Sequence, residues 1–109
     1  MIDGSQFEEL SSLYPGARII PEGGQEYIFL PELTLPNGCQ PAVVDALLCP
    51  SSRDGYLTRL FLSAPVAGKG SNWNQHHIAN RTWHTWSWRD VSANQRLLQI
   101  LLGHLDAFK

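Results

Sequence analysis

The chain has 109 residues, of which 43% are hydrophobic and 17% are charged, and its formal net charge is -2. This length suits one domain, residues 1–109, with a single core. The balanced charge excludes the strongly basic surface of a nucleic-acid-binding protein. The N-terminus lacks a basic region followed by an apolar run, and no apolar stretch reaches the about 20 residues of a membrane span. We therefore expect a soluble, cytoplasmic protein without nucleic-acid or membrane contacts.

The first predicted element is a short amphipathic helix. Ser5 and Glu8 have the spacing of a capping box, in which each side chain bonds the backbone amide of the other residue. Apolar residues then recur at helical spacing: Phe7, Leu10, Leu13 and Tyr14. Pro15-Gly16 ends this pattern, which predicts a helix of about two and a half turns.

Two β-prone runs follow, Arg18 to Pro21 and Glu26 to Leu30, and they flank a Gly-Gly pair. Because glycine readily adopts positive φ angles, this arrangement predicts the first hairpin. A short extended piece is expected at Leu33 to Leu35, since the prolines on both sides of it disfavour a long central strand.

A second strand pair is predicted in the middle of the chain. The run from Ala42 to Cys49 is nearly all apolar, as in a strand covered on both faces, and Pro50 closes it. After a turn at Arg53-Asp54-Gly55, the run from Tyr56 to Ser63 is expected to return as the fourth strand of an antiparallel meander.

All four tryptophans and three of the four histidines lie in the stretch from Asn72 to Val91, which we call the Trp/His segment. Neither a helical nor a strand period sorts these residues, so we expect a long irregular segment lying across the sheet. Indole rings contribute large buried areas, and each buried N–H needs an acceptor. We expect most of the tryptophans to pack in the core and one or two to remain on the surface as anchors for a partner.

A C-terminal helix is predicted after Ser92, which has the capping spacing with Gln95. Its apolar stripe consists of Leu97, Leu98, Leu101, Leu102, Leu105 and Phe108. Such a stripe must be buried against the sheet. Helices at both ends and strands between them indicate an α+β fold, with an N-terminal helix, a four-stranded antiparallel meander, a long irregular flap and a C-terminal helix.

Two cysteines, Cys39 and Cys49, are too few for a disulfide framework. A reactive thiolate needs a nearby cation, histidine or helix N-terminus, and only Arg53 lies close to Cys49 in sequence. The apolar neighbours of Cys49 favour a buried structural role. No cofactor is expected.

Histidines His76, His77 and His84 could supply imidazoles for zinc, but no Asp or Glu lies between Tyr56 and Arg89 to complete a ligand set. The chain also lacks a paired Cys-x-x-Cys and a His-Glu-x-x-His motif. We therefore expect no metal site.

Several short stretches resemble the prokaryotic E2 family E, a bacterial group similar to ubiquitin-conjugating (E2) enzymes. The similar stretches are Pro41-Ala-Val-Val-Asp45, Gly55-Tyr-Leu-Thr-Arg-Leu-Phe61, Asn72-Trp-Asn74, Arg81-Thr-Trp83, Ser87-Trp88 and Gly103-His-Leu105. The order of predicted elements is also that of the E2 core, and the resemblance extends over Tyr14 to Leu105. It implies a minimal UBC-like fold and a role in a bacterial ubiquitin-like conjugation system with an E1-like enzyme and a deconjugating protease.

The chain departs from conventional E2 enzymes at the reactive position. Those enzymes carry a His-Pro-Asn motif after the fourth strand and the thioester cysteine several residues later, within the flap. The corresponding region here, Ala64 to Val91, contains no cysteine. Pro36-Asn37 and Cys39 do not replace the motif, because they precede the predicted strand Ala42 to Cys49. The resemblance therefore implies an atypical or non-catalytic member.

As such a member, the protein would bind the ubiquitin-like modifier, its E1-like enzyme or another E2-like subunit. The expected binding surface combines Phe7, Leu10 and Tyr14 from the first helix with Trp73 and Trp86 from the flap.

Two alternatives stay open. The first is an active transferase whose acceptor is Cys49 or a flap hydroxyl, Ser87 or Thr85, with His84 as a base. The second is a small-ligand-binding domain whose pocket is lined by the Trp/His segment.

Overall fold

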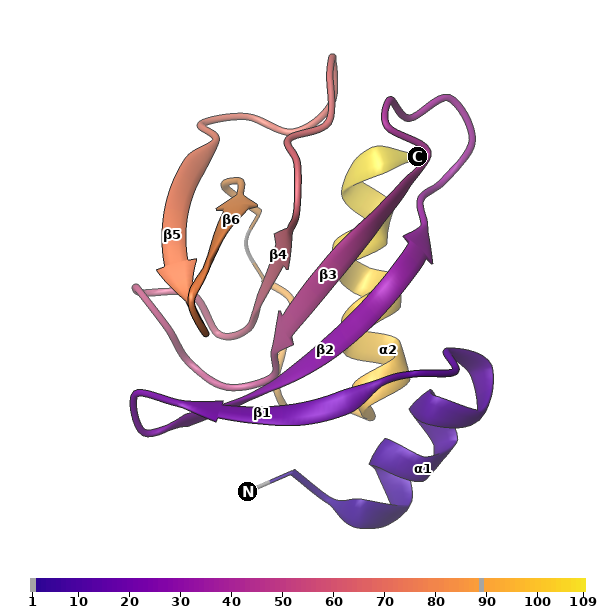
Figure 1. The fold of residues 1–109 in the computed structure, drawn as a ribbon, viewed down its shortest axis with the longest axis vertical. Helices are drawn as coiled ribbons and strands as arrows, with labels where there is room; N and C mark the ends of the chain where they lie inside the picture. Colours follow the sequence, from indigo (N-terminus) through magenta and orange to yellow (C-terminus); the bar gives the residue numbers. More distant parts are fainter. Residues whose placement is uncertain (1, 89) are drawn as a thin grey trace.

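In the part of the chain that the structure describes, residues 2–88 and 90–109, six strands form one curled antiparallel sheet (Figure 1). The structure is a computed structural model. Its elements are α1 (Gly4–Leu13), β1 (Arg18–Glu22), β2 (Gln25–Thr34), β3 (Val43–Cys49), β4 (Arg59–Leu62), β5 (Asn74–Ile78), β6 (Arg81–Thr85), α2 (Leu97–Leu105) and the short 3₁₀ helix η1 (Asp106–Phe108). The strand order is β1-β2-β3-β4-β6-β5, and α2 lies against one face of the sheet beside α1. The predicted α+β class is confirmed. None of the described helices is long and apolar enough to cross a membrane.

The first four strands form the predicted meander, with each strand antiparallel to the next. Strand β2 is longer than expected: the extended piece predicted at Leu33 to Leu35 continues it as far as Thr34, after a register shift beyond Leu30. Strand β4 is shorter than the predicted Tyr56 to Ser63, because Tyr56 closes the preceding turn by pairing with Arg53.

Both helices begin at positions that differ from the predicted caps. Asp3 caps α1, because its Oδ1 accepts a hydrogen bond from the amide of Gln6 at 3.0 Å. The capping box predicted from Ser5 is therefore wrong. Helix α2 begins at Leu97, whose amide donates to Oε1 of Gln6 at 3.1 Å. Ser92 instead accepts from a backbone amide two residues later, in a turn that precedes the helix.

Alternating side chains of the meander divide between two apolar clusters, as the period of a strand requires. The larger cluster lies between the sheet and the two helices and includes Leu10, Ile28, Leu30, Ala46, Leu48, Leu60, Leu62, Trp86, Ile100, Leu101 and Phe108. The smaller cluster, on the opposite face, consists of Tyr27, Leu47, Cys49, Phe61, Ile78 and Trp83. Both faces of the central strands are therefore covered.

The cover on the second face is the Trp/His segment, and its structure corrects the prediction of an irregular flap. Strands β5 and β6 pair in register and form a hairpin, and β6 joins the sheet through the pairing of His84 with Leu62. The hairpin turns at Ala79 and Asn80, whose φ angles are both positive. This left-handed turn brings Ile78 and Trp83 onto the second face of the meander.

Candidate functional site

Cys49 is the first of the predicted candidate nucleophiles. Its side chain is fully buried at the end of β3, and Sγ lies 3.4 Å from the backbone oxygen of Ser51. Burial is the largest cause that raises the pKa of this thiol, although its hydrogen bonds with Ser51 and the charge of Arg53 act in the opposite direction. The thiol is therefore neutral and shielded at pH 7, which does not suit an acceptor of an activated modifier.

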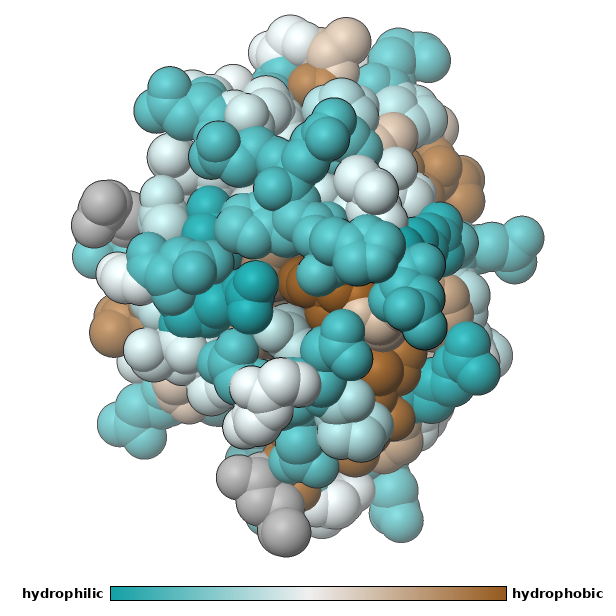
Figure 2. Space-filling model, turned by 60° about the vertical axis from the view of Figure 1, so that its left-hand side comes forward, coloured by the Kyte–Doolittle hydropathy of each residue, from teal (hydrophilic) through white to brown (hydrophobic). Residues whose placement is uncertain are grey.

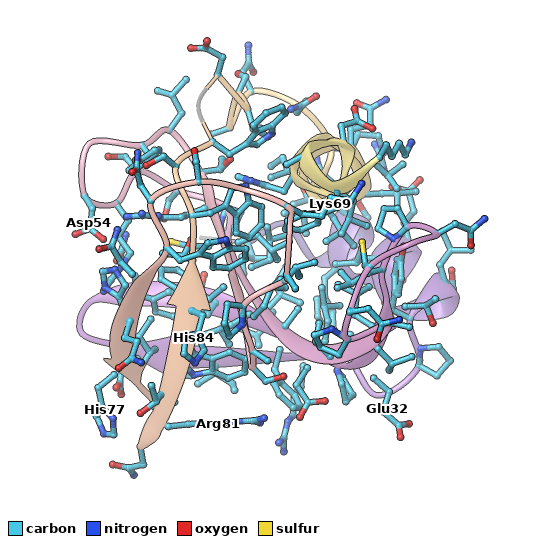
Figure 3. All side chains as sticks on the ribbon, turned by 90° about the horizontal axis from the view of Figure 1, so that it is seen from above. Glu32, Asp54, Lys69, His77, Arg81 and His84 are labelled. Carbon is cyan, nitrogen blue, oxygen red and sulfur yellow. The ribbon has the colours of Figure 1, made fainter. Side chains whose placement is uncertain are left out.

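The predicted flap hydroxyls are also engaged in structural contacts. Ser87 accepts a hydrogen bond from the Tyr56 hydroxyl at 3.2 Å, and its amide donates to Ser71. Thr85 is buried, and its hydroxyl donates to the backbone oxygen of Leu60 at 2.8 Å. His84 lies on β6 (Figure 3). Within the described residues, no hydrogen bond joins its ring to either hydroxyl. The structure therefore does not assemble a base–nucleophile pair from these residues.

The predicted binding residues lie mostly inside the molecule. Leu10 and Trp86 are buried in the larger cluster, so neither forms an exposed surface. Phe7, Tyr14 and Trp73 are half-buried and pack against that cluster. The rings of Trp73 and Phe108 are stacked, with their centroids 6.3 Å apart. This contact holds the tryptophan against the core. Of the five predicted binding residues, two are therefore buried and three are partly exposed.

The face seen in Figure 2 is mainly hydrophilic, and its hydrophobic surface is a narrow, interrupted strip between polar side chains. In the described part of the chain, the exposed large hydrophobic residues are Leu13, Ile19, Val43, Leu57, Trp88 and Leu102.

Three of these residues lie around shared hollows and form what we call the Trp88 patch: Leu57, Trp88 and Leu102. Their side chains are 54%, 37% and 44% exposed, respectively. Trp88 and Leu102 line a shallow hollow of about 420 Å³, and Trp88 and Leu57 line an adjoining hollow of about 60 Å³. An exposed tryptophan grouped with other exposed apolar side chains is a feature of protein contact sites, in which tryptophan is enriched.

The Trp88 patch is held in place by its contact with α2. The indole Nε1 of Trp88 donates to the backbone oxygen of Gly103 at 3.0 Å. At Gly103 an added Cβ would lie 3.2 Å from Cγ1 of Val91, so the absence of a side chain allows the loop to approach the helix closely. This hydrogen bond therefore fixes the orientation of the indole in the unbound protein.

A buried hydrogen-bonded group lies behind the patch. His104 is 1% exposed, and its Nε2 lies 2.8 Å from Oγ1 of Thr58. The Thr58 hydroxyl donates to the backbone oxygen of Val91, also at 2.8 Å, so Nε2 of His104 carries the proton that it shares with Thr58. These bonds connect α2 with the two loop segments that bear Leu57 and Trp88.

The patch carries negative charge at its rim. Asp90 and Asp106 line the larger hollow with Gln95 and Gln99, and no lysine or arginine is among the described residues lining it. Asp106 pairs with Lys109 at 3.0 Å, so its charge is partly compensated, and both partners are exposed.

Sequence reasoning missed this site for identifiable reasons. It assigned Leu102 to the buried stripe of the C-terminal helix, whereas the buried positions are Leu97, Ile100, Leu101, His104 and Leu105. Those positions recur every three or four residues, and Leu102 falls outside that series. A helical wheel could therefore have shown Leu102 to be exposed.

Within the described residues, no three His, Cys, Asp or Glu side chains converge in a way that could hold a metal ion. No protein-family model matches the chain, and comparison with curated proteins and with solved structures found no significant match.

Proposed function

We propose that the chain is a non-catalytic, E2-like component of a bacterial ubiquitin-like conjugation system that binds the ubiquitin-like modifier through the Trp88 patch. Two features support the E2-like part of the proposal: the stretches that resemble prokaryotic E2 family E, and a four-stranded antiparallel meander that follows one helix and precedes another. In such a component the β5–β6 hairpin would replace the usual flap.

One observation carries the non-catalytic part. Both thiols, Cys39 and Cys49, are buried in the two clusters, while the Trp88 patch is exposed and fixed by hydrogen bonds. An E2 enzyme that carries its cargo as a thioester needs an accessible thiolate. A binding component needs only a preorganised surface, because order present before binding lowers the entropy cost of association.

The chemistry of the patch specifies the partner's surface. Leu57, Trp88 and Leu102 require an apolar contact, and the Asp90 and Asp106 carboxylates at the rim favour lysine or arginine around that contact. The partner is therefore expected to present an apolar spot bordered by basic residues. The E1-like enzyme and another E2-like subunit are the competing partners that the experiment must distinguish.

The test measures binding of the purified chain to the modifier, the E1-like enzyme and the E2-like subunits encoded with it. Trp88→Ala and Leu57→Ser should each weaken modifier binding by about tenfold or more, since buried anchors of an interface typically contribute that much. Val43→Ser is the matched control, because Val43 is also exposed but lies at the start of β3. Leu13→Ser tests the competing surface on α1.

Absence of binding to the modifier overturns this assignment. Binding that Leu13→Ser abolishes and Trp88→Ala leaves intact would place the interface on the first helix instead. Binding of the E1-like enzyme alone would also reject the modifier as the partner of the patch.

A further inference from the structure

Two arginine side chains converge on one carboxylate beside Cys49. Asp54 and Gly55, both at positive φ, form a two-residue turn closed by hydrogen bonds between Arg53 and Tyr56. Oδ2 of Asp54 lies 3.2 Å from Nη1 of Arg59 and 3.2 Å from Nε of Arg53. The turn thus supplies both Arg53 and the carboxylate, and β4 supplies Arg59.

The second arginine is unusually buried for a charged residue. The Arg59 side chain is 6% exposed, and its guanidinium lies 4.1 Å above the centre of the Tyr56 ring. Arg53 is partly exposed and is held by the Tyr27 hydroxyl, 2.7 Å from Nη1. Both guanidinium groups also face the Phe61 ring. The aromatic rings orient the two cations but do not neutralise them.

Hydrogen-bonding capacity is left unused on both arginines. Nε of Arg59 and Nε of Arg53 are buried and have no hydrogen-bond partner among the described residues. Nε of Arg53 lies 3.2 Å from Oδ2 of Asp54, but this contact is not a hydrogen bond. Buried guanidinium N–H groups are normally satisfied, and leaving them unsatisfied is costly.

The charges of the cluster are also unbalanced. Arg53 and Arg59 contribute two positive charges and Asp54 one negative charge. Burial, as the largest cause, lowers the pKa of the neighbouring His76, so this ring is neutral at pH 7. The other described ion pairs engage their carboxylates elsewhere: Asp45 with Arg81, Glu9 with Arg96 and Asp106 with Lys109. Among the described residues, Asp54 is thus the only carboxylate within ion-pair distance of these two arginines.

We propose that Arg53 and Arg59 form a binding site for an oxyanion, a carboxylate or a phosphate group, which enters at the exposed Asp54 edge of the cluster. The planar guanidinium fork matches the oxygen geometry of both groups. Asp54 is 43% exposed and marks the open side, where Figure 3 shows it at the rim of the molecule. Its carboxylate already occupies part of the site, so it repels the incoming anion. This site adjoins the Trp88 patch, because Gly55 and Tyr56 also line the smaller hollow of that patch, but the proposal does not depend on the proposed function.

The test follows the Nε–H signals of the individual arginines by NMR during titration with sodium phosphate and, separately, sodium acetate. Sodium chloride keeps the ionic strength constant, because general screening would otherwise shift all exposed charges. The Nε–H signals of Arg53 and Arg59 should move in a saturable way. The Nε–H signal of Arg81, an exposed arginine paired with Asp45, serves as the internal control and should not saturate.

Two variants make the test specific. Asp54→Asn should lower the dissociation constant of the anion by at least about fivefold, since even a water-screened contact between two unit charges has that effect. Arg53→Gln should abolish saturation and, because Arg53 is only partly buried, leave the fold intact. Arg81→Gln should bind the anion as the wild type does.

Saturation by phosphate alone, by acetate alone or by both supports the site and identifies the group that it prefers. Linear shifts equal to those of chloride, or unchanged affinity in Asp54→Asn, overturn the proposal.

Discussion

Nε2 of His104 and Oγ1 of Thr58 lie 2.8 Å apart in the core, 46 positions apart in the sequence. The histidine comes from α2 and the threonine from the segment before β4, so this bond joins the helix to the sheet. Nδ1 of His104 is buried without a hydrogen-bond partner among the described residues. The ring is therefore neutral, with Nδ1 unprotonated. Burying an unpaired Nδ1 acceptor costs less free energy than burying the charged ring with an unpaired Nδ1–H.

The first prediction is that His104 makes the protein acid-sensitive. Burial, assisted by the charge of Arg59, lowers the pKa of His104 from 6.5 to about 4. Above pH 6.5 the folded and unfolded states are both neutral at this residue. As the pH falls from 6.5 to about 4, only the unfolded state gains the proton, so stability is lost over this window, by about 3 kcal/mol in total. Urea denaturation at a series of pH values measures this loss.

His104→Gln is the control for that experiment, because glutamine keeps a donor but does not titrate. Carboxylates such as Asp45, whose pKa is lowered chiefly by the backbone hydrogen bond from Glu32, lose their contribution only at lower pH. The difference between the wild type and His104→Gln in unfolding free energy, plotted against pH, gives the contribution of His104 alone. A difference curve that is flat between pH 6.5 and 4 would contradict the assignment.

The second prediction is that neither thiol reacts in the folded protein. Cys39 and Cys49 are both buried, so a thiol reagent should label them slowly under native conditions and completely in denaturant. Incubation with an E1-like enzyme, a modifier and ATP should likewise give no thiol-sensitive adduct. Cys49→Ala should leave modifier binding unchanged. Rapid labelling of Cys49 in the native state would restore the transferase alternative.

The third prediction separates two leucines of α1. Leu10 is fully buried between the helices and the sheet, whereas Leu13 is exposed. Leu10→Ala should destabilise the fold by about 2–5 kcal/mol, because it leaves a cavity in the core. Leu13→Ala should change stability by less than about 0.5 kcal/mol. Equal effects of the two substitutions on chemical denaturation would show that the helix does not pack as described.

The meander and the helices could be predicted because their signals are local. Gly23 and Gly24 form an ordinary hairpin turn, and the apolar run that becomes β3 is too hydrophobic to lie anywhere but in the centre of a sheet. The β5–β6 hairpin lacked such signals. Its turn uses Ala79 and Asn80 instead of glycine, and β5 is an edge strand that is largely exposed. The hairpin is held by contacts with distant segments, such as the packing of Ile78 and Trp83 on the meander and the pairing of His84 with Leu62, which are not visible in a local pattern.

The candidate sites were harder to predict than the fold, since they depend on contacts between distant segments. Trp88 could be recognised in the sequence as a possible anchor. The hydrogen bond that fixes it, from its indole N–H to the backbone oxygen of Gly103, joins residues 15 positions apart. Arg59 appeared as a polar residue in an apolar strand. Its position opposite Cys49 and its approach to Asp54 require both the strand register and the preceding turn.

The last prediction compares two buried tryptophans that differ in one hydrogen bond. Trp83 and Trp86 are each 2% exposed. Nε1 of Trp83 donates to the backbone oxygen of Ile78 at 3.1 Å, whereas Nε1 of Trp86 has no acceptor among the described residues. Replacement by phenylalanine leaves a similar cavity at both sites, but only at Trp83 does it remove a hydrogen bond, the one that the indole donates to Ile78. Trp83→Phe should therefore cost about 1 kcal/mol more in unfolding free energy than Trp86→Phe, which removes an unsatisfied donor. Urea denaturation of both variants measures the difference, and an equal or larger loss for Trp86→Phe would mean that its indole N–H has an acceptor after all.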